Sequence, residues 1–442
     1  MDATQPASAS PGPPAKARGM YTGWRIVGCT SIVGALLNGL FYNGMSAYFL
    51  PLQEHFQVSR TRLSFIFALR GLEGGLEGPI SGYLTDRLGG RVIMTTGLIW
   101  AGIGLVILPF MPNFTTFAIV FLLVVTTGFS MPVHGTMITI NRWFRRRLGT
   151  ALSVYTSGSA LGSLVLTPVL GYVIHAHGWR WGVGMSGIVV LCIGVPLALT
   201  LRYPRESEMD PKEQQPRASK GNASALNDAS GAEHDYSVGE AIRTPTYWMI
   251  AASIGFRLLG KSAITVHFVP LLTSKGISEP LAITLLAFSA VPRMFAGLGA
   301  GFLGDRWSRS KVSSLCMMVG VSGGLFMLFG PTGLLFGLGF AILIAISQSS
   351  DIMTWALISQ YFGRRNFGTL RGIATIVQAF VAFSGPLIFG YLYDKNQNYD
   401  TAMWIFIGAT AGAAALYWFM RPPRRPARNT SRMTQHTPGA PR

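Results

Sequence analysis

The sequence predicts an all-α membrane protein with 12 transmembrane helices, arranged as two six-helix bundles that are related by a parallel repeat. Composition is the first indication, because the 442 residues are 49% apolar and only 12% charged, whereas soluble domains carry roughly 25% charged residues. The second indication is a series of about twelve apolar stretches of about 20 residues, the length that crosses a bilayer. They begin near residues 25, 61, 92, 114, 149, 180, 246, 280, 312, 333, 368 and 401.

A charged segment that follows the second stretch occurs again after the eighth. Segment 82–91 reads GYLTDRLGGR and segment 301–311 reads GFLGDRWSRSK. The difference between positions 82 and 301 is 219, and FLPL at 49–52 returns at the same distance as FVPL at 268–271. A period this long is no solenoid repeat but two copies of one membrane half. Such a duplication is typical of transporters that bind their substrate between the two halves.

One long polar connection divides the chain into the domains that we expect. Residues 203–243 hold too little apolar content to fold alone and are predicted to form a cytoplasmic linker. The remaining domains are a disordered cytoplasmic tail at 1–20, a first bundle at 21–202, a second bundle at 244–421 and a basic cytoplasmic tail at 422–442.

The basic residues indicate orientation rather than nucleic-acid binding. The net charge is +18, but the arginines lie in short loops between apolar stretches, and they concentrate in alternate loops. The positive-inside rule then places both termini and the linker in the cytoplasm of a plasma membrane or bacterial inner membrane. The arginines that decide this are Arg87, Arg91, Arg142, Arg145, Arg146, Arg147, Arg306, Arg309, Arg364 and Arg365.

Several classes of function are not supported by the sequence. It has no nucleotide-binding loop, no metal-ligand cluster and no catalytic triad arrangement, and its three cysteines have no metal-site spacing. We therefore expect neither an enzyme nor a primary pump, and no cofactor or metal. The expected partners are the lipid bilayer, a small-molecule anion and protons, with no nucleic acid, and we expect a monomer.

The repeated charged segment identifies a family. Segment 82–91 resembles the loop 2–3 signature of the major facilitator superfamily, and 301–311 resembles its loop 8–9 counterpart, so the resemblance covers about residues 20–421 and implies the major facilitator fold. A carboxylate at such a helix end can accept hydrogen bonds from a neighbouring helix N-terminus and pair with arginine. We expect a cytoplasmic latch that opens during transport, with a static topology anchor as the alternative. Its residues are Gly82, Asp86, Arg87, Arg91, Gly301, Asp305 and Arg306.

Within the superfamily the chain is most similar to monocarboxylate transporters and oxalate/formate exchangers. The similarity rests on GW at 23–24, FLPL at 49–52 and GWR at 178–180. Monocarboxylate carriers place a lysine late in helix 1, where this chain reads FYN at 41–43, and Lys261 occupies the equivalent point of helix 7 instead. The substrate residues of that branch therefore cannot be transferred one for one.

Charges inside the apolar stretches fall on particular helices. The family resemblance implies that helices 1, 4, 7 and 10 line a central cavity, with helices 2, 5, 8 and 11 beside them. A charge at the bilayer centre costs at least ~2.5–3.5 kcal/mol, so such residues are expected to face a cavity or each other. All of them lie on those eight helices: Arg70, Glu73, Glu77, His134, Arg257, Lys261, His267, Arg293 and Asp351.

The signs of these charges favour an anionic substrate. Helices 7 and 8 carry three cations, and arginine can bind a carboxylate through two parallel hydrogen bonds. We therefore predict Arg293 as carboxylate ligand, with Arg257 or Lys261 as the second, whereas the alternative is internal pairing, for example of Lys261 with Asp351. Neutral contacts are predicted from Asn38, Tyr42 and Asn43.

The remaining intramembrane residues are candidates for proton coupling or gating. A carboxylate held away from water can take up a proton, which would couple transport to a proton gradient; a structural Arg–Glu network is the alternative. These candidates are Arg70, Glu73, Glu77, Asp351, His134 and His267. The predicted function is secondary transport of a mono- or dicarboxylate by symport or antiport. A proton-linked exporter of amphipathic or cationic compounds and a non-transporting membrane sensor are the alternatives.

Overall fold

The computed structural model describes residues 22–144, 148–202, 236–363 and 366–423. Both predicted tails and most of the predicted linker lie outside this part. All regular secondary structure within the described ranges is helical, which agrees with the predicted class. Inside the helices, some residues are described by their backbone alone, and these are 74–82, 85–86, 134, 137–138, 141, 148–149, 305, 351–352, 355–356, 359 and 367–368.

The first bundle contains six helical columns, three of which include a wider π-helical turn. Helix 1 is α1 (Thr22–Leu36), η1 (Leu37–Tyr42) and α2 (Gly44–Phe56); helix 2 is α3 (Arg60–Leu88); helix 3 is α4 (Gly90–Ile107) with η2 (Leu108–Phe110). Helix 4 is α5 (Phe114–Val120), η3 (Phe121–Thr126) and α6 (Thr127–Trp143); helix 5 is α7 (Leu148–His177); helix 6 is α8 (Trp179–Val189), η4 (Val190–Gly194) and α9 (Val195–Thr200).

The second bundle begins after a short helix and repeats the six columns. The short helix is α12 (Val238–Ile242), and helix 7 is α13 (Pro245–Ser274). Helix 8 is α14 (Glu279–Phe288) with α15 (Ala290–Arg306), and helix 9 is α16 (Arg309–Phe329). Helix 10 is α17 (Leu334–Gln348) with α18 (Asp351–Phe362), helix 11 is α19 (Phe367–Asn396), and helix 12 is α20 (Asp400–Phe419).

Within the stretches whose side chains are described, ten of these columns contain a helix long and apolar enough to cross a membrane. The middle of helix 2 lies outside these stretches, and helix 10 is divided between α17 and α18. Helix 2 carries Arg70, Glu73 and Glu77 within two turns, which lowers its hydropathy. In helix 10 the apolar part ends with α17 after 15 residues. The twelve-helix prediction is consistent with this architecture.

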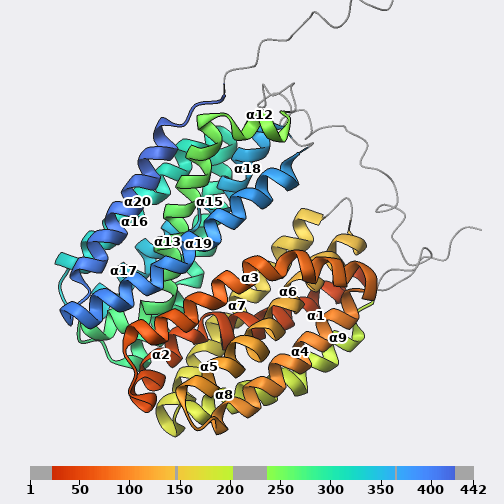
Figure 1. The fold of residues 1–442 in the computed structure, drawn as a ribbon, viewed down its shortest axis with the longest axis vertical. Coiled ribbons are helices and arrows are strands. Elements are labelled where there is room, and N and C mark those ends of the chain that lie inside the picture. The colour runs from red at the N-terminus through yellow and green to blue at the C-terminus, as the bar shows by residue number, and fades with distance from the viewer. Residues whose placement is uncertain (1–21, 145–147, 203–235, 364–365, 424–442) are drawn as a thin grey trace, which may run out of the picture.

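The two bundles lie side by side, and they converge toward the end where α2 lies (Figure 1). The hydrogen bonds that join them, among the described residues, also lie at this end. Ser46 of α2 donates to the carbonyl oxygen of Val266 at 3.0 Å and accepts from the amide of Val269 at 3.0 Å, both in α13. We call this the outer end, and the opposite end, which carries α12 and Arg202, the inner end.

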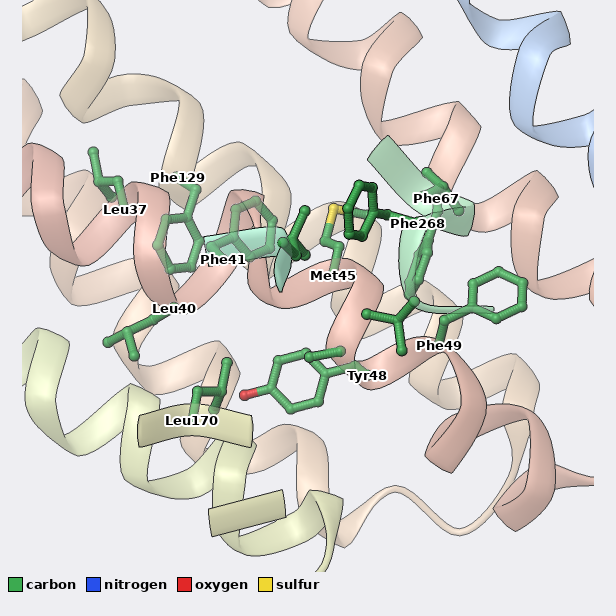
Figure 2. Close-up of a cluster of buried hydrophobic side chains, with 14 of the residues drawn as sticks. Leu37, Leu40, Phe41, Met45, Tyr48, Phe49, Phe67, Phe129, Leu170 and Phe268 are labelled. Carbon is green, nitrogen blue, oxygen red and sulfur yellow. The ribbon is translucent and has the colours of Figure 1, made fainter. Parts of the chain in front are cut away.

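An apolar cluster fills the bundle contact near the outer end. Figure 2 shows it following helix 1 from Leu37 through Phe41 to Phe49. Phe67 of α3 and Phe268 of α13 belong to the same buried cluster, and the rings of Phe49 and Phe67 meet edge to face at 6.0 Å. Since Phe268 comes from the second bundle, the cluster closes the outer end with side chains of both halves.

Small residues let helices 1 and 5 approach closely. A Cβ atom placed on Gly162 of α7 would lie 1.9 Å from the Cβ of Ala35 and 2.6 Å from its Cα. One on Gly34 would lie 2.1 Å from Oγ of Ser159. The glycines in the helix 5 segment thus serve the close packing that small-xxx-small sequences allow in membranes.

The last residues of the predicted linker pack on the second bundle. The amide of Tyr236 donates to the carbonyl oxygen of Phe362 at 3.1 Å, and Nδ2 of Asn366 donates to the carbonyl oxygen of Tyr236 at 2.8 Å. Ser237 and Glu240 form a capping box at the start of α12. This end of the connection is therefore attached to helices 10 and 11.

Candidate substrate site

Two cations of helix 7 line a small cavity inside the second bundle. Arg257 and Lys261 are four residues apart on α13, so they share one face of the helix. The cavity has a volume of about 20 Å³ and is lined also by Gln348, Phe406 and Thr410. That volume accommodates about one water molecule. A substrate can enter this place only if the surrounding helices move apart.

Arg293 joins this group from helix 8. Its Nη1 donates to Oε1 of Gln348 in α17 at 3.3 Å. Lys261 lies within electrostatic reach of both Arg257 and Arg293, and both repel its charge. Lys261 is therefore close to both arginines. The hydrogen bond from Arg293 to Gln348 connects helices 8 and 10 beside the cavity that Arg257 and Lys261 of helix 7 line.

A second polar group lies in the first bundle, around Arg70 of α3. Its guanidinium carbon stands 4.3 Å from the ring centre of Tyr42 and 4.8 Å from that of Phe41. Its Nη1 lies 2.9 Å from Sδ of Met45. Cation–π contacts of this kind stabilise a partly desolvated cation. The charge of Arg70 is thus directed at helix 1.

One turn further along α3, Glu73 is directed at helix 4. Its Oε2 accepts a hydrogen bond from Oγ1 of Thr126, and its electrostatic interaction with Arg70 is attractive. Its Oε1 is buried and has no hydrogen-bond partner among the residues whose side chains are described. A buried carboxylate oxygen of this kind is a natural place for a proton.

The residues that Arg70 and Glu73 contact lie in the π-helical turns of helices 1 and 4. Tyr42 belongs to η1 and Thr126 to η3. π-helical turns insert an extra residue into a helix and are frequent at functional sites. Sequence periodicity alone does not reveal such a turn, so the contacts of Arg70 and Glu73 could not be predicted from the sequence.

The neutral residues predicted for helix 1 have their amide groups engaged within the first bundle. Nδ2 of Asn38 donates to the carbonyl oxygen of Gly34 at 3.0 Å, and Nδ2 of Asn43 donates to Oγ of Ser163 on α7. Tyr42 faces Arg70 instead. Of these three residues, Tyr42 therefore stands nearest to an intramembrane charge.

His267 lies in a hydrogen-bonded network at the outer end. Its Nε2 is 3.0 Å from Oγ of Ser64 and 3.1 Å from the carbonyl oxygen of Pro386, and its Nδ1 is 2.9 Å from the hydroxyl of Tyr399. The residue is fully buried. Ser64 and Tyr399 had no sequence signal, because each lies more than 130 positions from His267 in the chain.

Several predicted residues lie outside the described part of the structure. The side chains of Glu77, His134, Asp351, Asp86 and Asp305 are among them, and Gly82 is described by its backbone alone, so the pairing of the cytoplasmic latch stays a prediction. Of the described latch residues, Gly301 lies in α15, and the guanidinium carbon of Arg306 stands 4.2 Å from the ring centre of Phe302. Arg87 and Arg91 line an inner-end pocket of about 370 Å³ together with Thr139, Arg142 and Arg202.

The architecture and the charges inside it can be compared with known proteins. A model of the Major Facilitator Superfamily matches residues 31–349 and 250–441 of this chain. The chain belongs to the major facilitator superfamily. The family that segment 82–91 indicated is thereby confirmed, and so are the two six-helix bundles that this family implies.

Curated relatives within the major facilitator superfamily lie in the branch that the sequence resembles. Monocarboxylate transporter 12 of Xenopus laevis is 23% identical over 390 residues, which cover 86% of this chain and 84% of that protein. The oxalate:formate antiporter of Oxalobacter formigenes is 23% identical over 436 residues, with 94% of this chain and 95% of the antiporter covered.

Solved structures of the superfamily share the fold. A D-xylose-proton symporter aligns with a TM-score of 0.68 at 17% identity, covering 91% of this chain and 98% of the symporter. A nucleoside transporter aligns with a TM-score of 0.69 at 13% identity, covering 89% of this chain and 99% of that protein. At this level of identity the likeness concerns the fold alone.

Proposed function

We propose that this superfamily member is a secondary active transporter that moves a small organic anion, a mono- or dicarboxylate, by alternating access. The observation that carries the proposal is the group of three cations in the second bundle: Arg257 and Lys261 line one cavity, and Arg293 is hydrogen-bonded to Gln348 of the same lining. Relatives named as monocarboxylate transporters and as an oxalate:formate antiporter support the same substrate class. Movement is driven by protons or by exchange.

The decisive experiment is counterflow in liposomes that contain the purified full-length protein. A panel of labelled mono- and dicarboxylates is offered, with a labelled sugar and cationic dyes as comparison. The proposal expects accumulation of at least one carboxylate and none of the dyes. Uptake of cationic dyes with no carboxylate transport would instead favour a proton-linked exporter. No counterflow of any compound would favour a non-transporting sensor.

We further propose that Glu73 carries a coupling proton. The buried Oε1 is the place for that proton, and Arg70 one turn away senses its arrival electrostatically. In a Glu73→Gln variant, carboxylate uptake should lose its dependence on a proton gradient, while exchange of internal for external substrate continues. The measurement is uptake with and without an imposed gradient.

A matched control is Asp400→Asn, which removes an exposed carboxylate at the start of α20. This variant should keep the gradient dependence of the wild-type protein. If Glu73→Gln keeps it as well, Glu73 is a structural partner of Thr126 and Arg70 and not a proton carrier.

The orientation in the membrane is a related proposal. Arg87, Arg91, Arg142 and Arg202 come together at the inner end, and the positive-inside rule places that end in the cytoplasm. In a cysteine-free background, a membrane-impermeant thiol reagent added outside intact cells should label Asn113→Cys but not Ser224→Cys. The reverse pattern would overturn this topology.

A further inference from the structure

The outer end contains a charged contact between the bundles that the substrate site does not use. Asp394, close to the end of α19, accepts hydrogen bonds from the backbone amides of Arg60 at 3.0 Å and Thr61 at 2.8 Å. It also accepts one from Oγ1 of Thr61. Arg60 and Thr61 are the first residues of α3, so the carboxylate of one bundle caps a helix N-terminus of the other, where negative charge is favoured.

The side chain of Arg60 strengthens the same contact. Its guanidinium carbon lies 3.5 Å from the ring centre of Tyr393, and its Nη1 donates to the hydroxyl of Tyr399 at 2.7 Å. The residue is only 9% exposed. Through Tyr399 the contact continues to His267 of α13. Helix 2 is therefore held by α19, by Tyr399 just before α20 and, through Tyr399, by α13 of the second bundle.

The repeat places a second charged pair at the equivalent position. Position 279 is 219 residues after Arg60, and it holds Glu279, the first residue of α14. Position 175 is 219 residues before Asp394, and it holds His175, close to the end of α7. Glu279 and His175 attract each other, while Glu54 of α2 repels Glu279. The two pairs thus occupy the same places in the repeat, with the carboxylate near the end of α19 in one and at the start of α14 in the other.

Close helix crossings accompany both pairs. A Cβ atom on Gly390 of α19 would lie 2.7 Å from Oγ of Ser64 in α3, and one on Gly171 of α7 would lie 2.7 Å from Cγ2 of Ile283 in α14. Both glycines, and also Ser64 and Ile283, are 219 residues apart. Asp394 and His175 each follow their glycine by four residues, which is about one turn. The two seams are therefore equivalent in backbone and differ in charge.

We propose that Asp394 with Arg60, and Glu279 with His175, form two outer latches that hold the outer end closed and release when it opens. This rests on the alternating access of the proposed function, because both contacts join bundles that separate in that cycle. The Asp394 latch is the stronger one, since its carboxylate receives three hydrogen bonds. His175 is exposed, and solvent weakens its attraction to Glu279.

The test measures the separation of the bundles without any substrate. Spin labels are placed at Thr115→Cys in the first bundle and Thr332→Cys in the second, both exposed at the outer end, in full-length protein that lacks its native cysteines. In lipid nanodiscs the wild-type protein should show mainly the short distance of the closed outer end. Asp394→Asn should raise the ratio of open to closed protein about tenfold, the size expected for losing hydrogen bonds to a charged group. Glu279→Gln should raise it by a smaller factor.

The control is Asp400→Asn, which removes a carboxylate at another helix start of the outer end and should leave the distances unchanged. Thr61→Val keeps the carboxylate of Asp394 but removes the hydroxyl donor of Thr61. This variant replaces Asp394→Asn in the test if Asp394→Asn does not fold. Wild-type distances in Asp394→Asn or Thr61→Val, in protein that is monodisperse, would overturn the proposal. Because no substrate is present, failure of carboxylate counterflow would refute the proposed function and leave this result standing.

Discussion

Arg293→Ala should abolish carboxylate uptake and leave the protein folded. Arg293 is partly exposed, and its described side-chain contact is one hydrogen bond to Gln348, so little packing is lost with it. What is lost is a guanidinium close to Lys261, which the proposed function uses as a carboxylate ligand. The measurement is initial uptake of the carboxylate found by counterflow, at matched amounts of reconstituted protein.

Arg293→Lys separates charge from geometry at this position. The ammonium keeps the positive charge but cannot make two parallel hydrogen bonds to a carboxylate. Its KM should rise at least about tenfold, which corresponds to the loss of one charge-assisted hydrogen bond. Normal anion uptake by Arg293→Ala would show that Arg293 of helix 8 is not a substrate ligand.

Gly162→Val should destabilise the first bundle more than any other single change considered so far. A Cβ atom there would lie 2.6 Å from the Cα of Ala35, and a backbone atom cannot turn away as a flexible side chain can. Helices 1 and 5 must then separate along their whole contact. Overpacking typically costs about 1–3 kcal/mol, and we expect the upper end of that range. A lowered Tm in detergent, followed by intrinsic fluorescence, is the measurement.

Gly28→Val is the matched control for this substitution. It introduces the same side chain on helix 1, where a Cβ atom would have no other atom within 4 Å. Its Tm should stay close to that of the wild-type protein. If both variants lower the Tm equally, the loss is a general effect of a valine side chain on helices 1 and 5 and not of the close contact of Gly162 with Ala35.

The architecture could be predicted from the sequence because the patterns that indicate it are local. The length of an apolar stretch predicts a membrane helix without reference to any other segment. The similarity of segments 82–91 and 301–311 alone indicates the duplication. The grouping of Arg257, Lys261 and Arg293 was also accessible, since burying three cations in a bilayer is costly unless they share a polar site. In the structure Lys261 lies within electrostatic reach of Arg257 and Arg293, and their role as a substrate site stays a prediction.

The outer network could not be predicted in the same way. Asp394 reaches Thr61 across 333 positions of the chain, and each of the two residues looks like an ordinary polar residue at a helix end. The repeat offset links Arg60 to Glu279 only after the contact of Arg60 is known, because the residue types differ at both equivalent positions and no sequence identity marks the pair. Contacts between bundles depend on the conformation, which a linear pattern does not encode.

The π-helical turn of helix 1 divides this helix into two parts that contact different helices. Before the turn, α1 packs on helix 5 of its own bundle, as Ala35 and Gly162 show; after it, Ser46 bonds to helix 7 of the other bundle. One extra residue rotates all following side chains by about 100° about the helix axis. Deleting a single residue from Leu37–Tyr42 would therefore turn the outer half of the helix away from its partner. Within the described ranges such turns occur in the first bundle alone, so the two copies of the repeat differ in the backbone of their helices as well as in their side chains.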